Sequence, residues 1–182
     1  LSQYIAKMNR QFLSKSKDDS HTNFYFDPLQ KALISQWLPS QKGPILFRLN
    51  LNHWSFEFLN QGFNLLQSIV LHDHRKMELE KSIIKVLHQL EIKSDGYKKA
   101  LHFQIPEYNL SEDFCQKTHP GELEEWMTYR TLANHACCQI LGSIQKQGSV
   151  RIWPHHFDTA IHVNLSPSVS LGFGLAMADN YC

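Results

Sequence analysis

The sequence lacks the features that mark zinc-binding, membrane-spanning and nucleic-acid-binding proteins. Its four cysteines include no Cys-x-x-Cys pair, which argues against a structural zinc knuckle. No apolar run approaches the roughly 18 residues that a membrane span needs. The formal net charge is only +1, and no basic stripe is present. We therefore expect neither a membrane nor a nucleic acid among the partners of the protein.

The sequence also lacks the usual signatures of export and of nucleophilic catalysis. The first residues do not show the charged-then-apolar pattern of a signal peptide. Cys137 and Cys138 are neighbours in an expected helix and point about 100° apart, so they cannot both meet one partner. We interpret all four cysteines as reduced thiols, which favours a cytoplasmic location. No Gly-x-Ser-x-Gly, Walker or His-Glu-x-x-His motif is present.

What the sequence does have is the composition of a folded protein that is rich in histidine. A hydrophobic fraction of 42% and an aromatic fraction of 12% are typical of globular chains. With 182 residues the chain is long enough to bury a sizeable core, and we expect a single domain over residues 1–182. The 11 histidines matter because imidazole titrates near neutral pH and is the commonest metal ligand.

Hydrophobic periodicity predicts helices and strands in a mixed order. Apolar residues recur at helical spacing over residues 2–14, 78–90 and 122–147. Alternating or short apolar runs predict strands at residues 24–26, 45–51, 54–58, 65–71, 100–105, 150–153, 157–165 and 169–176. Residues 29–38 fit either a strand or a short helix, and we favour the strand. This order predicts an α+β fold, with an antiparallel or mixed β-sheet and two main helices packed on it.

Two local patterns leave alternatives open. The pair Asn52-His53 is either a bulge within one strand or a tight reversal between two strands. Over residues 169–176, one strand face is apolar and the other has almost no side chains. The small face, which consists of Ser, Gly, Gly and Ala, allows a helix, another strand or a ligand to approach the backbone closely.

Polar chemistry is concentrated in the block Arg151-Ile-Trp-Pro-His-His-Phe-Asp-Thr-Ala160. If this block is extended, strand alternation puts His156, Asp158 and His162 on one face and sends His155 to the other. The Cα atoms of His156 and Asp158 would then lie roughly 6–7 Å apart, which suits a shared metal ion. The same spacing suits a polar pocket without metal, or a structural corner in which Asp158 orients His156. The block alone leaves all three interpretations open.

A divalent metal ion in this block would need a third ligand from elsewhere in the chain. His21 lies in a loop rich in Asp, Ser, Thr and Asn, and it is the best remote candidate. Together with His156 and Asp158 it would form a set of two histidines and one carboxylate.

The long predicted helix carries two polar residues on its apolar stripe. Arg130 and Asn134 lie one turn apart in that stripe. A buried guanidinium or amide needs partners, because leaving it unpaired costs several kcal/mol. Either Arg130 reaches the helix edge or pairs with a structural carboxylate, or both side chains point into a polar pocket.

Four blocks of the sequence resemble those of a family of uncharacterised bacterial proteins. The blocks are Asp18-Asp-Ser-His-Thr-Asn23, Trp126-x3-Arg130-x3-Asn134, Arg151-x-Trp-Pro-His-His-Phe-Asp-Thr159 and Ser170-Leu-Gly-Phe-Gly-x-Ala-x-Ala-Asp-x-Tyr181. The resemblance covers most of the chain. It implies where a site lies but not its chemistry, because the family has no assigned activity. Family members usually continue with an acidic-aromatic segment after the position of Tyr181, which implies that this chain is truncated at Cys182.

We expect the polar residues of these blocks to converge on a site for a small molecule. In an enzyme, His156 would be the base or a metal ligand, Asp158 its orienter or a second ligand, and Arg130 an anion clamp. The expected substrate-binding residues are Asn134, Asn23, Trp153 and His155, and Asp179 is a further polar residue of the blocks. The rival hypothesis is a non-enzymatic binding or structural protein in which these side chains form a buried network. The patterns indicate no particular oligomeric state.

Overall fold

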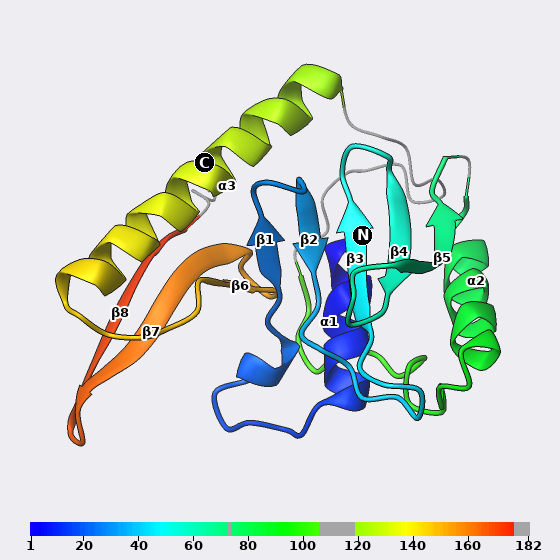
Figure 1. Cartoon of the computed structure of the whole chain (residues 1–182), viewed down its shortest axis with the longest axis horizontal. Helices are drawn as coiled ribbons and strands as arrows, with labels where there is room; N and C mark the ends of the chain where they lie inside the picture. The colour runs from blue at the N-terminus through cyan, green and yellow to red at the C-terminus, as the bar shows by residue number, and fades with distance from the viewer. Residues whose placement is uncertain (73, 106–118, 177–182) are drawn as a thin grey trace.

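The computed structural model of the protein describes residues 1–72, 74–105 and 119–176 (Figure 1). Its helical elements are α1 (Ser2–Phe12), the 3-10 helix η1 (Ser20–Thr22), α2 (Lys76–Gln89) and α3 (Pro120–Ser143). Its strands are β1 (Tyr25–Asp27), β2 (Ala32–Ile34), β3 (Leu46–Asn50), β4 (Ser55–Leu59), β5 (Leu65–Val70), β6 (Arg151–Trp153), β7 (Asp158–Ser166) and β8 (Val169–Leu175). The expected α+β class is confirmed. The strands, however, form two antiparallel sheets, of five and three strands.

The five-stranded sheet is a meander in the order β1-β2-β3-β4-β5, with each strand antiparallel to the next. The strand preference for residues 29–38 is confirmed by β2. Between β3 and β4 the chain reverses, so the Asn52-His53 pair belongs to a reversal and not to a bulge. Asn50 stabilises this reversal, because its Oδ1 accepts the backbone N–H groups of Asn52 and His53 at 3.1 and 3.0 Å.

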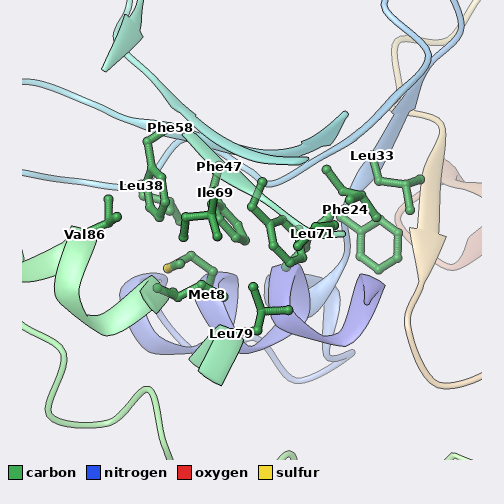
Figure 2. Close-up of a cluster of buried hydrophobic side chains, with 14 of the residues drawn as sticks. Met8, Phe24, Leu33, Leu38, Phe47, Phe58, Ile69, Leu71, Leu79 and Val86 are labelled. Carbon is green, nitrogen blue, oxygen red and sulfur yellow. The ribbon is translucent and has the colours of Figure 1, made fainter. Parts of the chain in front are cut away.

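One face of this sheet is covered by α1 and α2, and the main core lies between the sheet and these two helices (Figure 1). Figure 2 shows Met8 of α1 and Leu79 and Val86 of α2 against Phe47, Phe58 and Ile69 of the sheet. Strand alternation produces this arrangement, because every second side chain of β3 and β4 points to the same face. Each fully buried side chain of this size contributes about 1.5–3 kcal/mol of hydrophobic stabilisation.

The three-stranded sheet, in the order β6-β7-β8, packs against α3 (Figure 1). Its small core contains Cys137 and Leu141 of α3 with Ile161 and Val163 of β7. In the described ranges, one antiparallel bridge joins this sheet to the larger one. The backbone N–H of Phe24 donates to the carbonyl of Ile152 at 3.2 Å, and the reverse bond measures 2.7 Å. The bridge brings the β6–β7 hairpin beside the segment that precedes β1.

One predicted strand is wrong. Residues 100–105 contain no strand in the structure. Instead, the start of this segment and the turn before it are fixed to α1, because the guanidinium of Arg10 donates to the carbonyls of Ala100 and Gly96. The backbone carbonyls here therefore accept bonds from a helix side chain and not from a neighbouring strand. The alternation of apolar residues does not reveal this difference.

The small face of β8 is used by another strand. Gly174 pairs with Ala160 of β7, and a Cβ at Gly174 would lie 2.5 Å from the Ala160 Cβ and 2.6 Å from the Thr159 carbonyl oxygen. Gly172 pairs with His162, and a Cβ there would meet nothing within 4 Å. Of the two glycines, only Gly174 is required by close packing.

Gly174→Ala is expected to lower the free energy of unfolding by about 1–3 kcal/mol, because the methyl group overpacks the β7–β8 contact. The matched variant Gly172→Ala should stay within about 0.5 kcal/mol of the wild type. Urea unfolding of both variants measures the difference. Equal unfolding midpoints would contradict the assignment.

Candidate functional site

The histidine-containing block forms a β-hairpin and is not extended throughout. Trp153 at the end of β6 pairs with Asp158 at the start of β7, and residues 154–157 form the turn between them. The N–H of Phe157 donates to the Trp153 carbonyl at 2.7 Å, and Phe157 has a φ of 62°. This left-handed conformation is costly for a bulky residue. The prediction that one strand face carries both His156 and Asp158 is therefore wrong, because the turn interrupts the alternation.

The two histidines of the turn contact each other. The ring centroids of His155 and His156 lie 4.7 Å apart, whereas an extended chain would separate them onto opposite faces. His155 is half-buried and also contacts the ring of Phe103 at 5.5 Å, and His156 is exposed. Burial lowers the pKa of His155, neighbouring His156 lowers it further, and the nearby carboxylates of Asp19 and Asp158 act in the opposite direction. Within the turn, His155 is therefore the half-buried histidine, with the carboxylates of Asp19 and Asp158 nearby.

Arg130 is the most constrained polar side chain of the site. It is 4% exposed, and its Nη1 donates to the hydroxyl of Thr159 at 2.6 Å. Its guanidinium carbon lies 5.0 Å from the centroid of the Trp126 ring and 4.6 Å from that of Phe157. The two rings stack with centroids 5.9 Å apart. Within the described part of the chain, Nη2 of Arg130 is buried and has no hydrogen-bond partner.

Burial lowers the pKa of Arg130 to about 10, and Asp158 acts in the opposite direction. The guanidinium therefore stays charged at neutral pH. Asp158 lies close enough to stabilise that charge, yet the two side chains form no ion pair within 4.0 Å among the described residues. A buried charge is normally paired and fully hydrogen-bonded. Arg130 thus has a charge and a donor that the described residues leave without a direct partner.

Two predicted substrate-binding amides differ in their surroundings. Asn134 donates from Nδ2 to the Phe26 carbonyl at 3.1 Å, so it ties α3 to β1. Asn23 is fully buried, and its backbone carbonyl accepts bonds from the side chains of Asn9 and Gln36 at 2.7 and 3.1 Å. The side-chain nitrogen and oxygen of Asn23 are buried without a partner in the described residues. Asn134 therefore has a structural bond, while Asn23 keeps its hydrogen-bonding capacity.

The polar loop before β1 approaches the hairpin through an unforeseen segment. His102 Nε2 lies 2.9 Å from Asp19 Oδ2. The Phe103 ring next to it contacts both His102 and His155. Residues 102–103 therefore lie between the polar loop and the turn, although the sequence motifs did not include them.

His21 is fixed within its own loop. It is buried at 7% exposure, and its Nδ1 lies 3.2 Å from the hydroxyl of Ser16. Burial is the main reason that its pKa is lowered, and neighbouring Asp19 acts in the opposite direction. Among the described residues, no group of three or more His, Cys, Asp or Glu side chains is arranged to hold a metal ion. His21, His156 and Asp158 do not form the expected ligand set in this structure.

The structure thus brings described residues of all four predicted blocks together: Arg130 bonds to Thr159, Asp19 acts on His155, and Leu175 pairs with Thr159. Asp158 acts electrostatically on both Arg130 and His155, and Phe24 contacts Phe157 with centroids 5.9 Å apart. Trp153 is half-buried at the hairpin. The sequence reasoning missed Trp126, Phe157 and Thr159 as partners of Arg130, although all three lie in the quoted blocks. Asp179 lies outside the described residues, as do Cys115 and Cys182.

None of the helices in the described ranges combines the length and the apolar character needed to cross a membrane. Comparison of the chain with models of known families, with curated proteins and with solved structures gives no significant match.

Proposed function

We propose that the protein binds a small molecule carrying a carboxylate, and that Arg130 is the residue that receives it. The observation that carries the proposal is the buried Nη2 of Arg130, which has no hydrogen-bond partner in the described residues. A carboxylate matches the planar fork of a guanidinium, and the apolar wall beside it suits a carboxylate on an apolar body. The rings of Trp126 and Phe157 supply an apolar wall beside the charge.

The charge balance of the site supports this ligand class. Asp158 acts on Arg130 only from a distance, so the guanidinium still has room for a directly bonded anion. A completed ion pair would reduce the cost of burying the guanidinium, since buried charges are stable when they are paired and hydrogen-bonded. The half-buried His155 would be the titratable group beside the ligand. Its neutral form can accept or donate a proton, which is the acid–base capacity that an enzyme would need.

A second candidate is the structural network, and two hydrogen bonds favour it. Arg130 ties α3 to β7 through Thr159, and Asn134 ties α3 to β1 through the Phe26 carbonyl. In this alternative, Asp158 would be the partner of Arg130, and the residues would hold the helix to both sheets without a ligand.

Benzoate is the probe that separates the two candidates. We expect benzoate to raise the melting temperature of the wild type in a concentration-dependent manner, because a ligand that binds only the folded state stabilises it. Arg130→Met replaces the guanidinium by an uncharged, apolar side chain of similar length, and this variant should lose the response. Asp158→Asn should strengthen it, because it removes the carboxylate that competes for Arg130.

An equal benzoate response in the wild type and in Arg130→Met would refute the proposal. So would the absence of any response in both the wild type and Asp158→Asn. In the second case, a loss of stability in Asp158→Asn that matches the loss in Arg130→Ala would identify the structural network.

We also infer that the chain belongs to the bacterial family that its four blocks resemble. The inference is supported by the bond between Arg130 and Thr159, which joins two of those blocks at one point. A cytoplasmic location is part of the same proposal. It is supported by Cys137 and Cys138, which are both free thiols.

A further inference from the structure

The face of the five-stranded sheet opposite α1 and α2, which the described helices leave uncovered, has an unusual distribution of polar and apolar side chains. On this face, Glu57, Asn50 and Ser55 are only 7%, 6% and 2% exposed. Around them, Leu29, Phe63 and Leu65 are 93%, 65% and 57% exposed. The solvent face of an antiparallel sheet normally shows the reverse, with polar groups in water. All of these side chains except Ser55 line an open pocket of about 410 Å³.

The floor of this pocket is a connected polar network built on two neighbouring strands. Arg48 of β3 pairs with Glu57 of β4, and its Nε donates to Oε2 at 2.6 Å. The other carboxylate oxygen of Glu57 accepts bonds from Asn50 and Ser55, each at 3.1 Å. Arg48 Nη1 donates to Gln30 at 2.9 Å. Among the described residues, Nη2 of Arg48 has no hydrogen-bond partner, so one donor group of the floor is available to a ligand.

The positions of the polar and apolar side chains in the pocket indicate the kind of partner. Protein–protein interfaces usually have an apolar centre and a polar rim, whereas this pocket has a polar centre and an apolar rim. A small molecule fits such a site, since a few fixed polar groups orient it while apolar walls bury its body. The volume of the pocket is within the range of pockets for small ligands.

The charge of the lining residues restricts the ligand further. Among the described residues that line the pocket, Arg48 and Glu57 are the only Lys, Arg, Asp or Glu residues, and their charges cancel. An anionic head group would lie beside the carboxylate of Glu57, and a cationic one beside the guanidinium of Arg48. We propose that this pocket binds an uncharged carbonyl or amide compound with an apolar body. Its oxygen accepts from Arg48, and its body contacts Leu29, Phe63 and Leu65. The site is separate from Arg130 and does not depend on the carboxylate proposal.

Three probes with the same ring and different head groups test this proposal: benzamide, benzoate and benzamidine. Chemical-shift titration of isotope-labelled protein should show saturable benzamide binding, about ten-fold tighter than that of either charged probe, because each charged probe meets a like charge on the floor. Phe63→Ser should weaken benzamide binding, since it removes the Phe63 ring from the rim of the pocket. The ring is 65% exposed. Tyr129→Ser on α3, which is 62% exposed and does not line the pocket, is the matched control and should leave benzamide binding unchanged.

A second variant tests the floor directly. Arg48→Met should also weaken benzamide binding, and Phe63→Ser keeps the test decisive if Arg48→Met does not fold. Saturable benzamide binding that is equal in the wild type and in Phe63→Ser would overturn the site. Tighter binding of benzoate or benzamidine at this pocket would overturn the ligand class, and no saturable binding of any probe would overturn the proposal as a whole.

Discussion

Arg130→Met is expected to abolish benzoate binding while leaving the free energy of unfolding within about 1 kcal/mol of the wild type. A well-packed apolar side chain often replaces a buried charge without loss, because it avoids the cost of removing that charge from water. The thioether chain can keep contact with the rings of Trp126 and Phe157, which now touch the guanidinium. The remaining loss of stability comes from the Thr159 hydroxyl, which stays buried without the hydrogen bond from Arg130.

Arg130→Ala should behave differently and lower the free energy of unfolding by about 3 kcal/mol. It leaves a cavity beside two aromatic rings and also leaves Thr159 unpaired. Urea unfolding of both variants, with Thr159→Val added to Arg130→Met as a control for the unpaired hydroxyl, measures these terms. If Arg130→Met is as unstable as Arg130→Ala, the guanidinium is retained for stability and the ligand hypothesis loses its main support.

Local pattern predicted most elements of the fold because each depends on neighbouring residues. The alternation in residues 45–51 and 54–58 identifies β3 and β4, and the stripe at residues 78–90 identifies α2. The division into two sheets could not be predicted in this way. It depends on which strands meet across the chain, and the only backbone bridge between the sheets joins Phe24 to Ile152 among the described residues. Nothing in the periodicity of either segment specifies that contact.

The burial of Arg130 could be predicted from the sequence, whereas the geometry of the hairpin could not. The apolar stripe of the long helix correctly placed Arg130 in a buried position, and the structure confirms that it is 4% exposed. The prediction for His156 and Asp158 failed because Phe157 adopts a left-handed conformation that ordinary alternation does not include. Pro154 gave the only local indication of a break, and it does not specify the turn that follows.

The pocket on the uncovered sheet face was missed although a signal existed. If Asn52-His53 is a reversal, the two flanking strands are antiparallel neighbours, and Arg48 and Glu57 fall opposite each other. Opposite charges at paired positions stabilise a sheet. The exposure of Leu29 and Phe63 around that pair could not be predicted, because it depends on how the connecting loops fold over the sheet.

The largest loss of stability is expected for Phe47→Ala, at about 3–5 kcal/mol. Phe47 is fully buried, and its ring centroid lies 4.8 Å from those of both Phe56 and Phe58. Figure 2 shows the Phe47 side chain at the centre of the cluster between the sheet and the helices. Removing the ring deletes apolar contacts and aromatic interactions together, and the surrounding strands can close the cavity only partly.

Phe63→Ala provides a matched control, since it removes the same atoms from a side chain that is 65% exposed. It should change the free energy of unfolding by less than about 0.5 kcal/mol, and Phe47→Leu should cost about 1–1.5 kcal/mol because it conserves most of the volume. Chemical unfolding followed by circular dichroism gives all three values. Similar losses for Phe47→Ala and Phe63→Ala would mean that the two sheet faces are assigned the wrong way round. The pocket over Arg48 and Glu57 would then lose its basis, because β3 places Arg48 next to Phe47 and therefore on the opposite face.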